Sequence, residues 1–279
     1  MERGRGTPSD AGAPSASPAP PLELASLREA LIRLGVGPGD LLFVHSSWDG
    51  MANLAAGPTD VLAMLRELIG EEGTLAMPSN PILVEREGGR VYDVHRSPSK
   101  YGLLTEVFRR TRGVERSPIP LSTVCAIGPL AGHLTRDYLR QEVNTAYGEG
   151  SPYLELGRQG GKVLVLGVAV VRTLTLMHCA FDVLGEEACP LPDFFARDAL
   201  TVEREGGTET VQVRWQLAGN YDDYLATEAF TRLMMASGTC RPLGLPGMKG
   251  GLVDARAFLD WHLPLARRYG LPYWGFPRG

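Results

Sequence analysis

Two residues four apart, His178 and Asp182, give the clearest sign of chemistry in this sequence. On a helix, that spacing places both side chains on one face. Thr173 and Thr175 bring hydroxyl groups to the turn that precedes them. A histidine oriented by a carboxylate, beside hydroxyl hydrogen-bond donors, is suited to acyl transfer to an amine or an alcohol. The segment is therefore a candidate catalytic site.

The expected position of this segment in the fold supports the same interpretation. The apolar run 163–168 before it is typical of a buried strand, and residues 180–184 suit a helix. Open α/β sheets bind their ligands at the carboxyl ends of strands, where helices begin. The simpler alternative is that Thr173 caps the helix and that His178 is a half-buried histidine with satisfied hydrogen bonds.

Three other polar loops follow apolar strands or interrupt helices, and they are His45-Ser46-Ser47, residues 116–122 and residues 147–151. If the strand ends converge, these loops and the His178 segment form one cleft. Each loop also has a purely structural explanation when taken alone. Ser46 can cap the next element, Arg116 can form a surface ion pair, and residues 147–150 can be a glycine turn.

Strand and helix patterns alternate along the chain. Short apolar runs predict strands at 41–44, 74–77, 123–127 and 163–168. Apolar residues at helical spacing predict helices at 26–35, 57–68, 101–110, 152–156, 221–236 and 254–269, with Ser26 and Ser151 as N-caps. Alternating runs around Gly206-Gly207 predict a β-hairpin over 201–215, and the polar segment 85–99 is expected to leave the sheet. The fold class is therefore α/β, with a mixed central sheet flanked by helices and an additional β-hairpin.

Composition and charge argue against several classes of function. The chain has 279 residues, 44% of them hydrophobic, which is enough for one large core. Its net charge of −4 gives no support to a nucleic-acid or membrane partner. The four cysteines lack metal-site spacing, so we expect a reduced, cytoplasmic protein without a metal. No apolar run reaches the ~20 residues that span a membrane. Residues 1–22 are expected to be a disordered Pro/Ala/Ser-rich tail.

Several short motifs occur in a fixed order, among them Val44-His45-Ser46-Ser47, residues 147–152 and Thr175-Leu176-Met177-His178. The others are residues 34–40, 73–78, 97–102, 116–122 and 164–168. Together they resemble the aminoglycoside 3-N-acetyltransferase family, whose fold differs from that of the GNAT acetyltransferases. The resemblance runs from about Leu24 to about Tyr269. It implies a single acyltransferase domain over 23–279.

The resemblance also implies a reaction and roles for residues. The donor is an acyl-coenzyme A, usually acetyl-coenzyme A, and the acceptor is an amine of a small molecule. The histidine matching His178 acts as general base, and the one matching His45 lines the same site. The hydroxyls implied to hold the pantetheine arm or the thioester oxygen belong to Ser46, Ser47, Thr173 and Thr175. Four further residues are implied to bind other parts of the coenzyme, including its phosphates, and they are Ser79, Arg116, Ser117 and Ser122. The oligomeric state is left open, with a homodimer as one option.

Two positions depart from the family pattern. The family's His-x-x-Glu motif has Phe181 at the glutamate position, and the nearest carboxylate is that of Asp182. One residue along a helix rotates a side chain by about 100°. We therefore expect Asp182 to miss the imidazole nitrogen that the glutamate would reach and to contact the acceptor instead. The family's Arg-Ser-x-His-Pro loop has Ile119 in place of its histidine.

These departures leave three interpretations of function open. The chain acylates an amine other than an aminoglycoside, in biosynthesis, or it confers antibiotic resistance with Asp182 replacing the lost glutamate. The third is a relative that binds an acyl carrier or ligand without turnover, since fold does not imply function. Acidic or polar groups in the cleft would favour a cationic acceptor, and the candidates are Asp49, Tyr147, Glu149 and Asp222.

Overall fold

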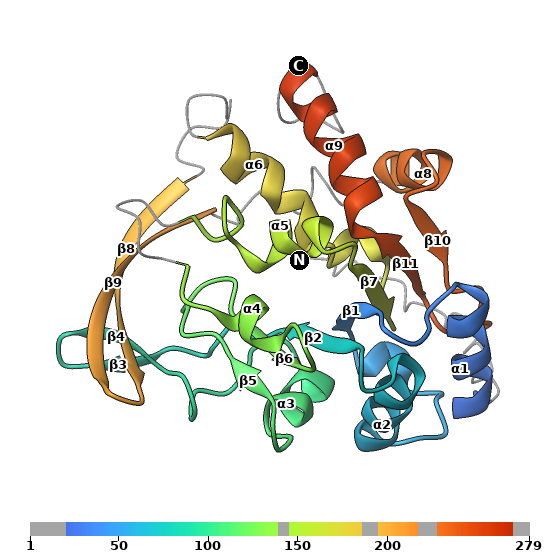
Figure 1. Ribbon diagram of the computed structural model, residues 1–279, viewed down its shortest axis with the longest axis horizontal. Helices are drawn as coiled ribbons and strands as arrows, with labels where there is room; N and C mark the ends of the chain where they lie inside the picture. Colours follow the sequence, from blue (N-terminus) through green and yellow to red (C-terminus); the bar gives the residue numbers. More distant parts are fainter. Residues whose placement is uncertain (1–20, 139–144, 186–194, 217–227, 270–279) are drawn as a thin grey trace, which may run out of the picture.

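A seven-stranded sheet forms the centre of the molecule in the computed structural model, which describes residues 21–138, 145–185, 195–216 and 228–269 (Figure 1). Its strands lie in the order β10-β11-β7-β1-β2-β6-β5. Their bounds are Leu41–Ser46 (β1), Thr74–Pro78 (β2), Glu115–Arg116 (β5), Val124–Ile127 (β6), Lys162–Leu166 (β7), Cys240–Pro242 (β10) and Gly250–Asp254 (β11). β10 and β11 were not predicted from the sequence.

The three strands at the middle of this sheet are parallel. β1 pairs in parallel with β7 on one side and with β2 on the other. The outer strands pair antiparallel, which makes the sheet mixed, as predicted. From β1 the chain continues to β2 on one side and later to β7 on the other, so the strand order reverses at β1. In open α/β sheets, ligands bind in the crevice outside the carboxyl ends of the strands at such a point.

Alternation along the central strands sends side chains to two buried faces. Leu42 and Val44 pack on one face, with helices α1 (Leu24–Arg33), α2 (Pro58–Ile69) and α3 (Leu103–Arg109). Leu41 and Phe43 pack on the other face, with α4 (Ala131–Thr135), α5 (Pro152–Arg158), α6 (His178–Leu184), α8 (Glu228–Ala236) and α9 (Ala255–Tyr269). Figure 1 shows the two sets of helices on opposite sides of the sheet. Because both faces are covered, the central strands are apolar along most of their length.

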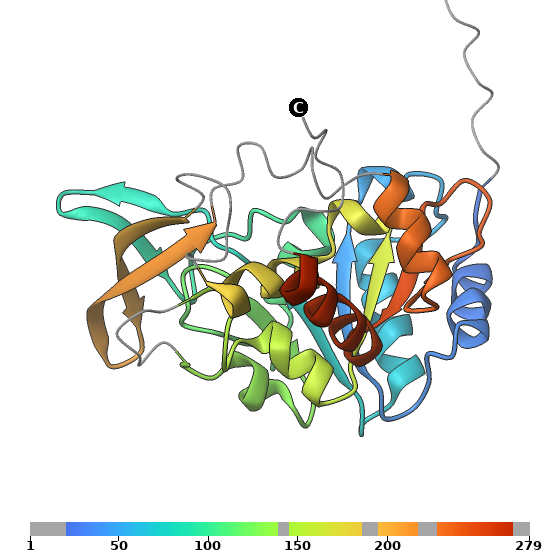
Figure 2. The same cartoon turned by 90° about the horizontal axis from the view of Figure 1, so that it is seen from above.

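A second sheet of four strands stands beside the first, in the order β3-β4-β8-β9 (Figure 2). β8 (Phe195–Arg204) and β9 (Gly207–Gln216) form the predicted hairpin, which is longer at both ends than expected. Segment 85–99 leaves the central sheet, and part of it forms β3 (Val84–Arg86) and β4 (Gly89–Asp93). β4 pairs in parallel with β8. Figure 2 shows α6 between the two sheets, with its carboxyl-terminal end toward the hairpin.

The helix starts show which local signals were right. Ser151 caps α5 by accepting a hydrogen bond from the Leu154 N–H at 3.3 Å, and Pro152 takes the first helical position, as predicted. The prediction that Ser26 caps the first helix was wrong, because α1 already begins at Leu24. Thr173 does not cap α6, since two short 3-10 turns, η2 (Val170–Arg172) and η3 (Thr175–Met177), separate β7 from the helix.

Further observations concern the predicted tail, the cysteines and the membrane. Residues 1–20 of the tail lie outside the described residues, whereas Leu22 is already paired with Leu54. Cys125, Cys179 and Cys240 are buried free thiols, and Cys189 lies outside the described ranges. Across the described ranges, no helix combines the length and the apolar character that crossing a membrane requires.

Candidate active site

The carboxyl ends of the three parallel strands bring together residues from distant parts of the chain. His45 and Ser46 end β1, and Asn80 follows β2. Thr175 and His178 follow β7 through the 3-10 turns. Nε2 of His45 lies 3.1 Å from Oγ1 of Thr175, so the loops after β1 and β7 meet in one place, as the sequence predicted.

His45 is almost completely buried, with 5% of its surface exposed. Its ring packs edge-on against Phe43, with the ring centroids 5.2 Å apart. Burial and, to a lesser extent, the nearby His178 lower the pKa of His45 to about 3. The imidazole is therefore neutral at pH 7. A neutral imidazole in contact with a hydroxyl can polarise that hydroxyl without adding a charge to the site.

His178 begins α6 and is half-buried. Its Nδ1 lies 2.9 Å from Oε1 of Gln216, and Nε2 of Gln216 donates to the backbone carbonyl of His178 at 3.1 Å. Tyr147 stacks on the imidazole, with centroids 4.6 Å apart and an interplanar angle of 19°. Burial lowers the pKa of His178 to about 4, and the hydrogen bond with Gln216 opposes that shift. At pH 7 the ring is therefore neutral, which is the form that a general base needs.

Asp182 lies one helical turn beyond His178 but is directed at other partners. Its Oδ2 accepts a 2.6 Å hydrogen bond from the Tyr147 N–H, and its Oδ1 lies 3.8 Å from Nη2 of Arg214. Burial raises the pKa of Asp182, while hydrogen bonding from Gln216 and from Tyr147 lowers it. Asp182 thus misses Nδ1 of His178, as expected from its position one residue beyond the family glutamate, and Gln216 faces that nitrogen instead. Only 9% of Asp182 is exposed, which leaves little of it for an acceptor.

Aromatic side chains form a wall around the two histidines. Tyr153 packs against Phe43 and Tyr147, with centroids 5.5 Å and 5.0 Å apart. The hydroxyl of Tyr101 accepts a 3.1 Å hydrogen bond from Nδ2 of Asn80. Tyr101 also contributes, after burial, to raising the pKa of Tyr147, which places it near the same ring. This wall limits water around His178 and accounts for its lowered pKa.

The hydroxyls predicted to contact the coenzyme differ in accessibility. Ser46, Ser47 and Thr173 are half-buried, whereas Ser79, Ser117 and Ser122 are at most 1% exposed. The Oγ of Ser117 accepts from the Val124 N–H at 3.1 Å, and the Oγ of Ser122 lies 2.9 Å from the Tyr138 hydroxyl. These two buried serines are therefore engaged within the fold. Ser46 and Ser47 remain the more accessible candidates for coenzyme contact, because the hydroxyl oxygen of Thr173 is itself buried.

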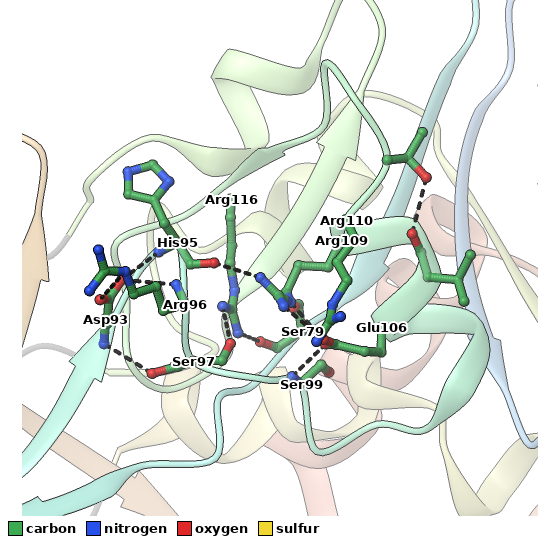
Figure 3. A network of polar contacts seen from close by, with 12 residues as sticks. Ser79, Asp93, His95, Arg96, Ser97, Ser99, Glu106, Arg109, Arg110 and Arg116 are labelled. Atoms are coloured by element: carbon green, nitrogen blue, oxygen red, sulfur yellow. Dashed lines mark hydrogen bonds and ion pairs between the residues drawn. The ribbon is translucent and has the colours of Figure 1, made fainter.

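Arg116, on β5, joins the two loops that follow β2 and β4 (Figure 3). Its guanidinium donates to the carbonyls of Ser79 at 2.8 Å, Ser97 at 2.6 Å and Val94 at 3.1 Å. It also lies over the ring of Tyr92, 5.0 Å from the centroid. Backbone carbonyls take donors on both Nη1 and Nη2, so these contacts favour a structural role, and binding of coenzyme phosphates by Arg116 stays a prediction. The residue stabilises the loops that follow β2 and β4.

Three of the four residues predicted to bind the acceptor lie within the described ranges, and they have different surroundings. The ring of Tyr147 stacks on the imidazole of His178, and Tyr147 is half-buried. Asp49 is exposed on the short helix η1 (Asp49–Met51). Glu149 is exposed and binds Arg158 at 2.6 Å. Asp222 lies outside the described residues. Of the four, Tyr147 alone contacts the candidate base in the part of the chain that the structure describes.

Comparison with known proteins identifies the family of this chain. A family model described as aminoglycoside 3-N-acetyltransferase matches residues 43–260. The chain belongs to that family. It is 32% identical to the aminoglycoside N(3)-acetyltransferase III of a Salmonella species over 213 residues, which cover 71% of this chain and 70% of the relative. With the aminoglycoside N(3)-acetyltransferase VII of Streptomyces paromomycinus it shares 32% identity over 177 residues, or 57% of this chain and 60% of that one.

Solved structures of similar acetyltransferases share the fold. The AAC-IIIb complex with coenzyme A superposes with a TM-score of 0.71 at 29% identity, covering 89% of this chain and 97% of that one. A gentamicin complex of AAC(3)-IVa gives a TM-score of 0.70 at 26% identity, covering 89% of this chain and 90% of that one. The implied family, fold and donor are thus confirmed. This chain is an N-acetyltransferase that uses acetyl-coenzyme A to acylate an amine of a small molecule.

Proposed function

We propose that this acetyltransferase acetylates an amino group of an aminoglycoside, with His178 as general base. The observation that supports it best is the neutral, half-buried imidazole of His178 beside His45 and Thr175, at the reversal point of the central sheet. The relatives named above are aminoglycoside N(3)-acetyltransferases. The structural neighbours include complexes with gentamicin and apramycin. A place in the cytoplasm, where acetyl-coenzyme A is available, belongs to the same proposal.

In the proposed reaction, the acceptor nitrogen attacks the carbonyl carbon of the thioester. The resulting tetrahedral adduct carries a positive nitrogen, whose proton is far more acidic than that of a free ammonium group. A base with a pKa of about 4, as His178 has, can therefore take this proton onto Nε2. The carbon–sulfur bond then breaks, the coenzyme leaves as a thiolate, and the proton passes from His178 to the sulfur. The products are an N-acetylated acceptor and free coenzyme A.

The developing charge on the thioester oxygen needs a hydrogen-bond donor. Thr175 is the candidate, because its hydroxyl contacts His45, a residue close enough to His178 for the two imidazoles to interact electrostatically. If Nε2–H of His45 donates to Oγ1 of Thr175, the threonine hydroxyl hydrogen is directed elsewhere and can donate to the oxyanion. Such donors typically stabilise the transition state by ~2.7–4 kcal/mol. His45 then acts through Thr175, as a positioning residue.

The replacement of family residues by Phe181 and Ile119 supports a second candidate acceptor. Both side chains are 1% exposed and apolar, where the family pattern has a carboxylate and an imidazole. A cleft with fewer polar groups suits a smaller or less cationic amine than an aminoglycoside. This alternative keeps the same donor and the same base.

Thiol release from acetyl-coenzyme A tests the choice of acceptor. The panel contains gentamicin, apramycin and sisomicin, the same scaffolds with the 3-amino group removed, and simple primary amines. We expect turnover with at least one aminoglycoside and its loss when the 3-amino group is absent. Turnover with simple amines alone would contradict an aminoglycoside acceptor and support the second candidate.

The pH dependence of kcat/KM is expected to follow the acceptor rather than an enzyme histidine. Since the pKa of His178 is lowered from 6.5 to about 4, protonation of the base removes activity only near pH 4. Above that, kcat/KM should rise with pH as the acceptor ammonium loses its proton. The measurement compares two acceptors whose amine pKa values differ by about one unit, which should displace the profile by the same amount. If kcat/KM fell below about pH 6.5 with both acceptors, regardless of the pKa of the amine, the lowered pKa of His178 would be contradicted.

A further inference from the structure

The end of the hairpin is aligned with the first turns of α6. Arg214 and Gln216 are two apart on β9, so they point to the same side of the strand. His178 and Asp182 are four apart on α6 and share a face of the helix. Gln216 bonds His178, while Arg214 lies 3.8 Å from Asp182. Two residues along a strand advance it by ~6.6 Å, and four residues along a helix advance it by ~6 Å. The spacing of Arg214 and Gln216 is therefore close to that of Asp182 and His178, so each strand residue can contact one helix residue.

The amide of Gln216 binds one residue, His178, at two points. Its Nε2 donates to the backbone carbonyl at 3.1 Å, and its Oε1 lies 2.9 Å from Nδ1 of the ring. A carbonyl oxygen can only accept, so the NH₂ end of the amide must face it. The amide oxygen must then face Nδ1. The orientation of the amide is fixed by the backbone, independently of the protonation of the ring.

An amide oxygen can only accept a hydrogen bond, so its partner Nδ1 must carry the hydrogen. In a neutral imidazole with the hydrogen on Nδ1, the lone pair that accepts a proton is on Nε2. From this geometry we infer that Gln216 is the positioning residue that fixes the tautomer of His178 and makes Nε2 the base, in place of the family glutamate that Phe181 displaces. This inference rests on the proposed function of His178, although the tautomer itself can be observed without any substrate.

Asp182 supports the same arrangement from the side of the helix. Hydrogen bonding from Gln216 lowers the pKa of Asp182, which places the NH₂ end of the amide toward the carboxylate. The same carboxylate accepts from the Tyr147 N–H at 2.6 Å, and the Tyr147 ring stacks on the imidazole. Asp182 therefore does not contact the imidazole of His178 directly, but it helps to position that ring through Gln216 and Tyr147.

The chemical consequence is a neutral partner where the family pattern has a charged one. A carboxylate at Nδ1 would favour the imidazolium and raise the pKa of the base by about 1–3 units. An amide selects the tautomer while adding no charge, so its raising effect on the pKa is outweighed by burial, in accordance with the pKa of about 4 for His178. Such a base suits a proton that is already acidic, like that of the tetrahedral adduct.

The test combines the tautomer of His178 with kinetics in Gln216 variants. Nitrogen-15 NMR of the resting protein should show His178 protonated at Nδ1. Gln216→Met keeps the length of the side chain but removes both hydrogen bonds. We expect it to shift the ring toward the Nε2–H tautomer and to lower kcat by roughly 10–100-fold, the cost of losing a comparable partner of a metal-bound histidine. The KM for acetyl-coenzyme A should be unchanged.

Two further variants separate positioning from folding. Gln216→Glu retains an acceptor for Nδ1, so it should keep the Nδ1–H tautomer, restore most of kcat and move the acid limb to higher pH. Gln212→Leu changes an exposed residue on the same strand and should leave both tautomer and kcat unchanged.

The NMR and kinetic results can fail separately. Predominant Nε2–H in the wild-type protein, or an unchanged tautomer and kcat in Gln216→Met, would overturn the inference even if acetyl transfer occurs. Correct tautomers without turnover on any amine would leave Gln216 in its role and contradict the proposed function instead.

Discussion

Replacing His178 with alanine should lower kcat by about 10²–10⁴-fold, the range that a positioned general base contributes. The variant removes the group whose Nε2 accepts the proton of the tetrahedral adduct, while the oxyanion donor at Thr175 remains. The binding surface for coenzyme A is expected to persist, because His45, Ser46 and Ser47 are unchanged. Steady-state thiol release gives kcat, and calorimetric titration with coenzyme A gives the affinity.

The control is His95→Ala, which removes an exposed histidine from the loop after β4. It should leave kcat and affinity unchanged. A thermal melt of each variant shows that both are folded. Turnover of His178→Ala within a few-fold of the wild type would contradict general-base catalysis by this residue.

Replacing Arg116 with methionine is expected to destabilise the fold by roughly 3 kcal/mol or more, because hydrogen bonds to charged groups contribute about 1.5–3 kcal/mol each. The carbonyls of Ser79, Val94 and Ser97 would lose their common donor. For a chain of this size, the loss corresponds to a decrease in Tm of roughly 6–12 °C. The KM for acetyl-coenzyme A of the folded variant should be close to that of the wild type. Thermal melts and steady-state kinetics below the transition measure the two effects.

Arg112→Met is the matched control, since Arg112 is exposed and lies four residues earlier. It should change neither Tm nor KM. The opposite pattern for Arg116→Met, an unchanged Tm with a large increase in the KM for acetyl-coenzyme A, would show that the guanidinium binds the coenzyme phosphates after all.

Much of the central sheet could be predicted because its strands are buried on both faces. Runs such as 41–44 and 163–168 are apolar without interruption, and this leaves little choice of structure. The second sheet was only half predicted. β8 and β9 alternate around a glycine turn, whereas β3 is three exposed residues with no apolar pattern. β10 has only three residues and β11 follows glycine- and proline-containing sequence, so periodicity gave no signal there.

The position of the site was predictable, but the hydrogen-bond partners within it were not. Polar loops that follow buried strands predicted that His45, Thr175 and His178 lie in one cleft, and the structure places these residues close together. Gln216 gave no signal, because a polar residue at the end of a solvent-facing hairpin is ordinary. Its role depends on how β9 is aligned with α6, which is a property of tertiary packing. Likewise, an arginine at position 116 has the same appearance in a sequence whether it binds a phosphate or three backbone carbonyls.

The central claim is the transfer of an acetyl group to an acceptor amine, and the product tests it most directly. The protein is incubated with acetyl-coenzyme A and an aminoglycoside, and the acceptor is then analysed by mass spectrometry and NMR while free thiol is counted. We predict one thiol released for each acetyl group found, with the acetyl group on a single nitrogen. Thiol release without an acetylated acceptor would mean that the site only hydrolyses the thioester, and it would contradict the proposed function.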